Sequence, residues 1–243
     1  MINLLNEDLE NVQAEIRAVK KQLRELYPHM SNFEFDQIVN NFVYEKIGIN
    51  IKLPSDPIMQ PSTYSKPTHL PKDFIVFDLE TTGFQARRDQ IIQIGAIRYV
   101  NFVPTVQFNT LINPMRPIPE RITQLTSIQN EDVWDMPTID SVLPEFLTFV
   151  GDATLLAHNA SFDMKFLIEK MDQCQLAPQQ FHVIDTMALA KKYIKNVPNY
   201  KLPTFKQFFN MQHVASHEAL ADCEVTGKLY EYCYREALLR QQT

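Results

Sequence analysis

Cysteine is scarce in this 243-residue sequence, and long apolar runs are absent. Its three cysteines, Cys174, Cys223 and Cys233, are too few and too scattered for a disulfide framework or a zinc module. No stretch approaches the roughly 18 consecutive apolar residues of a membrane span. The N-terminus also lacks the basic and then apolar pattern of a secretion signal. These absences predict a soluble, cytoplasmic protein without membrane contact.

Excess positive charge is also missing, since the net charge is −6. Broad electrostatic binding to duplex DNA needs clustered Lys and Arg to neutralise phosphates, so this balance argues against that class of protein. The length allows one substantial core and a small accessory unit.

An apolar, strand-like run from Phe74 to Gly83 carries two acids, Asp78 and Glu80, and ends in a glycine turn. Residues two apart in a strand point to the same face, so both carboxylates should project together. Like charges this close raise a pKa unless a cation lies between them. Taken alone, the pattern also fits a strand with incidental acids.

Two later segments of the chain supply further polar residues, in the order that such a site would need. After a short apolar strand, Ser161 is the expected N-cap of a helix, which places Asp163 in the first turn. The helix dipole alone would also favour an acid there. Further on, His217 and Asp222 are five residues apart and do not share a helix face. His217 is therefore expected before that helix, bending back over the site.

These motifs together resemble a known family. Asp78-x-Glu80-Thr-Thr-Gly83, His158-Asn-Ala-x-Phe-Asp163 and His217-x4-Asp222 are similar, in this order, to the three motifs of the DnaQ-like DEDDh exonuclease superfamily. The family includes the proofreading epsilon subunit of bacterial DNA polymerase III and the exonuclease domain of Gram-positive replicative polymerases. The resemblance covers roughly residues 73 to 237. Four shorter stretches resemble its DNA-directed branch: Gln90–Ile97, Ile112–Pro114, Ile184–Thr186 and Tyr200–Leu202.

The resemblance implies a 3′-5′ exonuclease that releases nucleoside monophosphates from DNA 3′ ends, in proofreading or repair. It implies four metal ligands: Asp78, Glu80, Asp163 and Asp222. Carboxylate oxygens suit two hard divalent cations, Mg²⁺ or Mn²⁺. His217, with a near-neutral pKa, is the implied general base for the attacking water.

The same resemblance assigns five residues to the substrate: Thr81, Gly83, Phe84, Leu125 and Asn159. Phe84 follows the acids and is expected to stack on the terminal base. An ordinary core position for Phe84 or Leu125 is an open alternative.

The chain departs from the family pattern at two positions. Ser127 fills a turn where many relatives have glycine, which puts the substrate-side loop in doubt. Glu218 stands where relatives often carry arginine, and an acid there should weaken a phosphate contact without abolishing catalysis.

The first 52 residues lie outside the family pattern and predict a helical hairpin. Apolar residues at alternating spacings of four and three form a heptad seam from Leu5 to Leu26. Ser31 and Glu34 form a capping box for a second helix, which is expected to end at Gly48. The hairpin either folds back on the chain, self-associates or binds a partner such as a polymerase or helicase. Residues 53–72 are proline-rich and predict a semi-rigid linker.

The catalytic domain, residues 73–243, is expected to be α/β, and the resemblance implies a ribonuclease H-like mixed sheet flanked by helices. Strands are predicted near 74–79, 91–99, 105–112, 154–158 and 182–185. Helices are predicted near 138–150, 162–173, 186–194, 204–210 and 218–238. Six aromatic residues are expected in the core: Trp134, Phe146, Phe149, Phe166, Phe208 and Phe209.

Other functions stay open from the sequence. An RNA 3′-end trimming enzyme of the same fold is the nearest alternative, since the motifs do not separate the two sugars. A phosphatase of the haloacid dehalogenase type also begins with an apolar strand and an acid, but it needs a second Asp as its general acid. Glu80 stands at that position, and its side chain is too long for the role. A catalytically idle tethering module for a polymerase or helicase would not need all five of the implied site residues.

Overall fold

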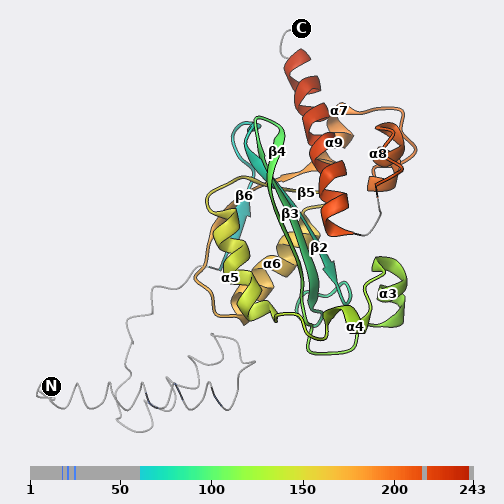
Figure 1. Cartoon of the computed structure of the whole chain (residues 1–243). Coiled ribbons are helices and arrows are strands. Elements are labelled where there is room, and N and C mark those ends of the chain that lie inside the picture. Colours follow the sequence, from blue (N-terminus) through green and yellow to red (C-terminus); the bar gives the residue numbers. More distant parts are fainter. Residues whose placement is uncertain (1–17, 19–20, 22–24, 26–60, 215–217, 241–243) are drawn as a thin grey trace, which may run out of the picture. The chain divides into compact units, whose positions relative to one another are not determined.

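The computed structural model describes residues 61–214 and 218–240, together with Ala18, Lys21 and Glu25. The chain divides into two units, Met1–Met59 and Gln60–Thr243. In the first unit the three described residues are helical and exposed, and none belongs to the predicted seam. The rest of the predicted hairpin lies outside the described residues. The second unit carries the sheet (Figure 1).

A six-stranded mixed sheet forms the centre of the second unit, in the order β1-β6-β5-β2-β3-β4. Strands β1, β6, β5 and β2 run parallel, β3 pairs antiparallel with β2, and β4 pairs antiparallel with β3. The strand bounds are β1 Thr63–Ser65, β2 Phe74–Thr81, β3 Ile91–Val100, β4 Val103–Leu111, β5 Leu155–Ala157 and β6 Gln180–Asp185. Strand β2 is thus central in the sheet, between β5 and β3.

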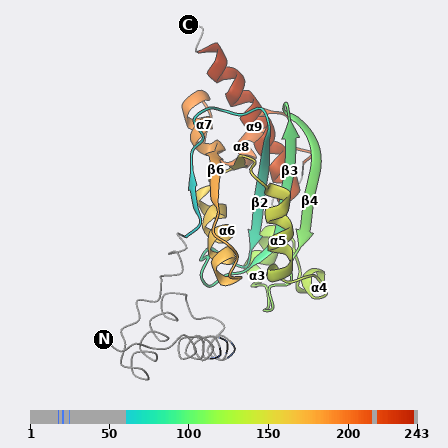
Figure 2. The ribbon, with the colours of Figure 1, turned by 90° about the vertical axis from the view of Figure 1, so that its left-hand side faces the viewer.

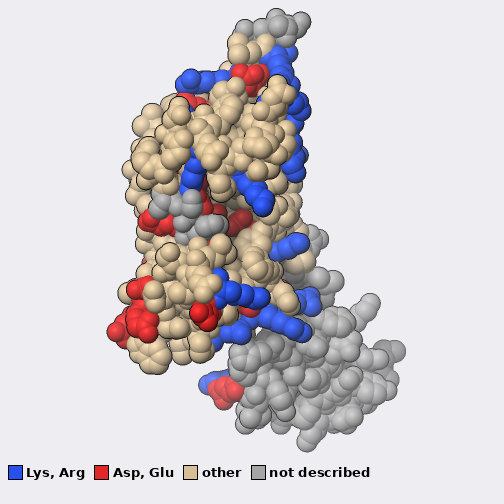
Figure 3. Space-filling model, turned by 90° about the vertical axis from the view of Figure 1, so that its right-hand side faces the viewer, with Lys and Arg blue, Asp and Glu red and all other residues tan. Residues whose placement is uncertain are grey.

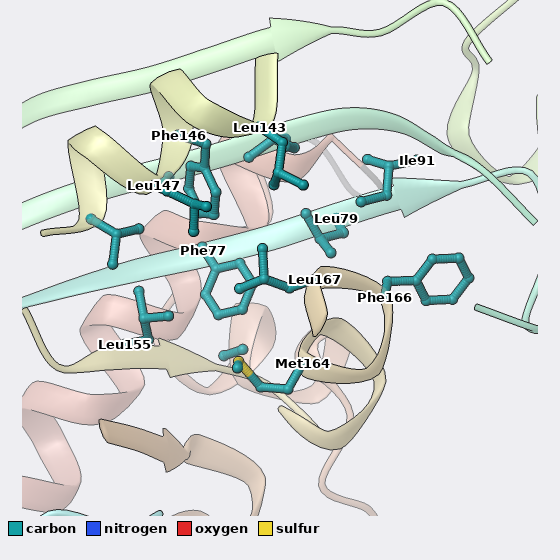
Figure 4. Packing of buried hydrophobic residues seen from close by; sticks show 14 of the residues in the cluster. Phe77, Leu79, Ile91, Leu143, Phe146, Leu147, Leu155, Met164, Phe166 and Leu167 are labelled. Carbon is teal, nitrogen blue, oxygen red and sulfur yellow. The ribbon is translucent and has the colours of Figure 1, made fainter. Parts of the chain in front are cut away.

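One face of the sheet is covered by α5 (Ile139–Val150) and α6 (Ser161–Gln173) (Figure 2). Ile75, Phe77 and Leu79 of β2 point to this face and belong to one buried apolar cluster with residues of both helices (Figure 4). Phe146 and Met164 contribute from the helices, and each is fully buried. Alternate residues of β2 therefore build this core, as the period of two requires.

The opposite face is covered by the long helix α9 (Ala219–Leu239). Phe74 and Val76 of β2 pack there with Cys223 and Tyr230 of α9. Helices α7 (Thr186–Tyr193) and α8 (Leu202–Phe208) pack beside α9 through a further apolar cluster. The short helices α3 (Glu120–Thr126) and α4 (Asn130–Val133) follow β4. Within the described residues, no helix combines the length and the apolar character that crossing a bilayer would require.

The predicted α/β architecture with a mixed sheet is confirmed, and each predicted strand and helix of residues 73–243 has a counterpart. Among the residues that the structure describes, three elements were not predicted: α3, α4 and β1. Strand β1 lies inside the predicted linker 53–72 and pairs with β6, so this part of the linker extends the sheet. The predicted N-cap at Ser161 is wrong by one residue, because α6 begins at Ser161 and Ala160 caps it.

The predicted aromatic core is correct in part. Phe146 and Phe166 are fully buried, and Phe149 packs at the edge of the same cluster. The prediction that Trp134 lies in the core is wrong, because this residue is 75% exposed at the end of α4. The prediction for Phe208 is also wrong, because this residue is 42% exposed. Apolar character alone does not tell which face of a short helix points to solvent.

Candidate active site

Asp78 and Glu80 lie on the α9 side of β2, because they continue the alternation begun by Phe74 and Val76. Asp222 reaches them from the first turn of α9. One carboxylate oxygen of each of these three acids lies within 4.8 Å of the others. The predicted projection of both strand acids toward one face is therefore correct. On this side of the molecule, Figure 3 shows a hollow with Asp and Glu side chains in it and Lys and Arg side chains beside it.

Gly95 of β3 explains how α9 comes close enough to bring in Asp222. Gly95 is the cross-strand partner of Asp78. A Cβ atom at Gly95 would lie 2.6 Å from the carbonyl carbon of Ala219 and 2.7 Å from the amide nitrogen of Leu220. The start of α9 thus rests on bare backbone directly beside Asp78. The Cys223 thiol also donates to the carbonyl oxygen of Gly95, at 3.4 Å.

Asp163 lies close to this group without belonging to it. It occupies the first turn of α6 and is 3% exposed. The backbone N–H of Leu79, between the two strand acids, donates to Asp163 Oδ1 at 3.2 Å. Its carboxylate is thereby fixed against the backbone of β2, and its charge acts on Asp78. Its role as a metal ligand stays a prediction.

Burial, and after it the charges of nearby acids, raise the pKa values of Asp78, Glu80 and Asp163. Burial, followed by the charges of Asp163, Glu80 and Asp222, holds the pKa of Asp78 well above its usual value of 3.8, while Lys206 acts in the opposite direction. Burial and then Asp222 raise the pKa of Glu80 from 4.5 to about 7. Burial also raises the pKa of Asp163 from 3.8 to about 8, although backbone hydrogen bonds oppose the change.

A hard divalent cation fits this group of residues. Converging carboxylate oxygens without a thiolate are the donors that Mg²⁺ and Mn²⁺ prefer. The raised pKa values of Asp78, Glu80 and Asp163 arise first from burial and then from nearby like charges, and a bound cation would oppose both effects. Asp78, Glu80 and Asp222 are the residues that would hold it.

A buried lysine, Lys206 of α8, also enters the group. Its Nζ lies 2.9 Å from Asp222 Oδ1, and the lysine side chain is 5% exposed. Lys206 was not predicted as a site residue. The sequence offers only a weak signal, because Lys206 follows an apolar residue in a short helix and could equally face solvent.

The residues predicted to contact substrate surround the end of β2. The Thr81 hydroxyl donates to the carbonyl oxygen of Gly83 at 2.6 Å, which closes the turn. A Cβ atom at Gly83 would meet the carboxylate of Asp89, which accepts from the N–H of Gln85 at 2.8 Å. Phe84 is 67% exposed, so its core alternative is wrong. Its ring centroid lies 6.3 Å from that of Phe162.

Asn159 and Leu125 lie on two other segments. Asn159 has a left-handed backbone (φ 68°), and its N–H donates to Asp185 Oδ1 at 3.2 Å. Leu125 is 42% exposed on α3, so it is not an ordinary core residue. The turn after α3 is left-handed at Ser127 (φ 62°), as expected where relatives have glycine.

The predicted base, His217, lies outside the described residues. Glu218, the residue that follows it, is the N-cap of α9. The other motif histidine, His158, has a structural position: its Nε2 donates to the carbonyl oxygen of Tyr200 at 2.8 Å. Burial lowers the pKa of His158, which favours its neutral form.

The family model described as an exonuclease of the RNase T type matches residues 75–230. The PolC-type DNA polymerase III of Caldanaerobacter subterraneus subsp. tengcongensis is 39% identical over 158 residues, which is 65% of this chain and 11% of that protein. The DNA polymerase III subunit epsilon of Aquifex aeolicus is 35% identical over 157 residues, covering 65% of this chain and 78% of the subunit. The chain thus spans only about a tenth of the PolC-type relative.

Among solved structures, exonuclease X in complex with 5′ overhanging duplex DNA has a TM-score of 0.53 and 24% identity. The match covers 67% of this chain and 91% of that one, and it supports the fold. The family model covers most of the second unit, including Asp78, Glu80, Asp163 and Asp222. The predicted resemblance is therefore confirmed, and the chain belongs to the exonuclease family.

Proposed function

We propose that this chain is a metal-dependent 3′-5′ exonuclease that releases nucleoside monophosphates from single-stranded or frayed DNA 3′ ends. The observation that carries the proposal is the meeting of Asp78, Glu80 and Asp222 within 4.8 Å. Burial, and after it the charges of neighbouring acids, raise the pKa values of Asp78 and Glu80, which is typical of a functional site. A phosphodiester hydrolase needs such a group to hold cations.

Each residue has a role in the proposed reaction. When bound, two divalent cations, Mg²⁺ or Mn²⁺, neutralise the carboxylates and the charge that develops on the scissile phosphate. Asp78, Glu80, Asp163 and Asp222 would hold these cations. His217 takes the proton of the attacking water as a general base. The water oxygen bonds to phosphorus while the bond to the 3′ oxygen of the preceding nucleotide breaks, and this leaving oxygen takes up a proton from solvent.

A polynucleotide substrate has two supports near the end of β2. Phe84 and Phe162 form an aromatic pair, with Phe84 exposed enough to stack on a base. A surface pocket of about 490 Å³ is lined by Arg87, Arg88 and Lys165, a few residues along the chain from Gly83 and Asp163. Glu169 offsets part of this charge through an ion pair with Arg87 at 3.7 Å. The remaining positive charge suits the phosphates of a strand.

An end-label assay tests the proposal. Single-stranded DNA and RNA of one sequence, each labelled at the 5′ end, are incubated with the full chain and Mn²⁺, with Mg²⁺ or with excess EDTA. The expected result is a ladder of DNA shortened from its 3′ end, with nucleoside monophosphates as the other product. Faster trimming of RNA would favour the RNA-directed alternative. Internal cuts alone, or full activity in EDTA, would contradict the proposal.

Two variants of α6 make the assay specific to the site. Asp163→Asn should remove activity, since its carboxylate lies against β2 between Asp78 and Glu80. Asp172→Asn makes the same chemical change at an exposed position of the same helix and should keep wild-type activity. Equal loss in both variants would show that the assay reports stability and not the site.

We also propose that residues 1–52 form a helical hairpin that binds a polymerase or helicase, or a second copy of this chain. The catalytic unit is expected to begin before 73, because β1 at Thr63–Ser65 pairs with β6. Deletion of residues 1–59 should therefore keep turnover on short oligonucleotides, whereas deletion of residues 1–70 also removes β1. Light scattering of the full and shortened chains would show whether the hairpin self-associates. Loss of turnover in the folded shorter deletion would contradict this division.

A further inference from the structure

Lys206 brings a positive charge up to the carboxylate group. Its residue exposure is 4%, and lysine is seldom buried this deeply unless it is paired. Its Nζ lies 2.9 Å from Asp222 Oδ1, and its charge also acts on Asp78. This lysine thus pairs with one of the three residues that would hold a metal ion, and its charge acts on a second.

The helix that carries Lys206 is held firmly in place. Its neighbour Phe205 is fully buried and contacts the ring of His158 edge-on, with 5.9 Å between centroids. His158 in turn donates to the carbonyl oxygen of Tyr200, just before α8. Pro203 stiffens the first turn of this helix. The lysine therefore points at Asp222 from a fixed backbone.

An ammonium group and a metal ion can each neutralise the carboxylates of this site. Buried carboxylates at close range are stabilised by any nearby positive charge. Two cations that are close together repel each other, and the repulsion is strong where water is largely excluded. An oxygen that accepts from an ammonium is also a weaker donor to a second cation. Lys206 should thus stabilise the metal-free protein and oppose metal binding.

Resting on the proposed function, we propose that Lys206 is a built-in cation of the carboxylate site, which stabilises the site without metal and competes with a divalent ion for Asp222. The lysine acts as a positioning and charge-balancing residue. It sets the metal concentration at which the enzyme becomes loaded.

Mn²⁺ titration of the full chain by calorimetry, combined with thermal unfolding, tests this role. Lys206→Met keeps most of the side-chain volume and removes the charge. Without metal, its unfolding midpoint should fall by about 5 °C or more, since the change breaks a buried ion pair with Asp222. Its dissociation constant for Mn²⁺ should fall about tenfold or more, because one like charge is gone. Mn²⁺ should then raise its unfolding midpoint further than that of the wild type.

Lys228→Met is the matched control, since Lys228 lies on α9 in an exposed ion pair with Glu231. It loses the same charge and should bind Mn²⁺ as the wild type does. If Lys206→Met folds neither with nor without Mn²⁺, Lys206→Gln decides, because its amide still donates to Asp222 without a charge.

An Mn²⁺ dissociation constant in the Lys206 variant that is equal to or above the wild-type value would overturn the inference. That result leaves the proposed function intact, since the wild type still binds metal. Absence of Mn²⁺ binding by the wild type would overturn both.

Discussion

The two faces of β2 follow the same alternation of side chains, but one face is apolar from Ile75 to Leu79 and the other becomes acidic at its carboxyl end. Toward α5 and α6 the strand presents Ile75, Phe77 and Leu79, all buried in one apolar cluster. Toward α9 it begins in the same way with Phe74 and Val76, and then presents Asp78 and Glu80. One strand thus joins a face that stabilises the fold to a face whose charges repel.

The difference shows what the apolar face makes possible. Packed carboxylates with raised pKa values lower stability, and they persist only where other contacts fix the backbone. The α5 and α6 face supplies these contacts for β2, and Gly95 lets α9 close over the acids. Substitutions on the two faces should therefore separate activity from stability.

Asp78→Asn should have the largest effect on turnover. It removes an expected ligand from the charged face, so turnover should fall by at least about 10³-fold. It also removes one repelling charge, so the metal-free protein should unfold at the same or a higher temperature. Turnover and calorimetric unfolding on one preparation check both statements. A variant that loses activity only because it unfolds would contradict the division between the faces.

His217→Ala should have the next largest effect and separates the base from the ligands. Turnover should fall by roughly 10²- to 10⁴-fold, the usual contribution of a positioned general base. Mn²⁺ affinity should stay near the wild-type value, unlike that of Asp222→Ala. Titration of both variants with Mn²⁺ measures this difference. If the two lose metal binding equally, the role assigned to His217 is wrong.

Gly95→Ala should have a smaller effect, transmitted through the backbone. A Cβ at this position meets the backbone of Ala219 and Leu220 within 2.7 Å, so α9 must shift away from β3. Asp222 moves with α9, and turnover should fall about tenfold or more. Stability should fall by about 1–3 kcal/mol because of overpacking. Wild-type turnover in this variant would show that the close approach of α9 does not position Asp222.

The pH dependence of stability offers a milder test of the charged face. The folded pKa values of Glu80 and Asp163, about 7 and about 8, lie above their usual values of 4.5 and 3.8. Between these limits the folded protein binds more protons than the unfolded chain, so stability falls as pH rises from about 4 to 8. Unfolding midpoints of the metal-free protein should decrease over this range. Glu80→Gln should flatten the decrease, and an unchanged slope would show that Glu80 does not contribute to it.

The sequence was sufficient for the parts of the site that depend on local periodicity. The placing of Asp78 and Glu80 on one face follows from the strand period alone. The family pattern also marks Ser127 as a turn position that prefers glycine, and the backbone there is left-handed. Both are properties of a few adjacent residues.

Contacts between distant segments could not be predicted in this way. Nothing local in the sequence shows that Gly95 receives the start of α9, or that Lys206 turns toward Asp222. The expectation that Trp134 is buried was wrong for the same reason, because burial depends on what packs against a short helix. Such features arise from tertiary packing, which a single sequence does not display.

Phe77→Leu on the apolar face should leave turnover almost unchanged. Phe77 is 1% exposed, and its ring contacts that of Phe146, with 6.0 Å between centroids. The smaller side chain leaves a partly filled space among α5, α6 and the sheet, so stability should fall by about 1–2 kcal/mol. Because Phe77 points away from α9, the spacing of Asp78, Glu80 and Asp222 should persist. Denaturant unfolding and turnover well below the unfolding midpoint measure the two effects. A loss of turnover comparable to that of Gly95→Ala would mean that the two faces are coupled through the strand and that the apolar core also tunes the carboxylates.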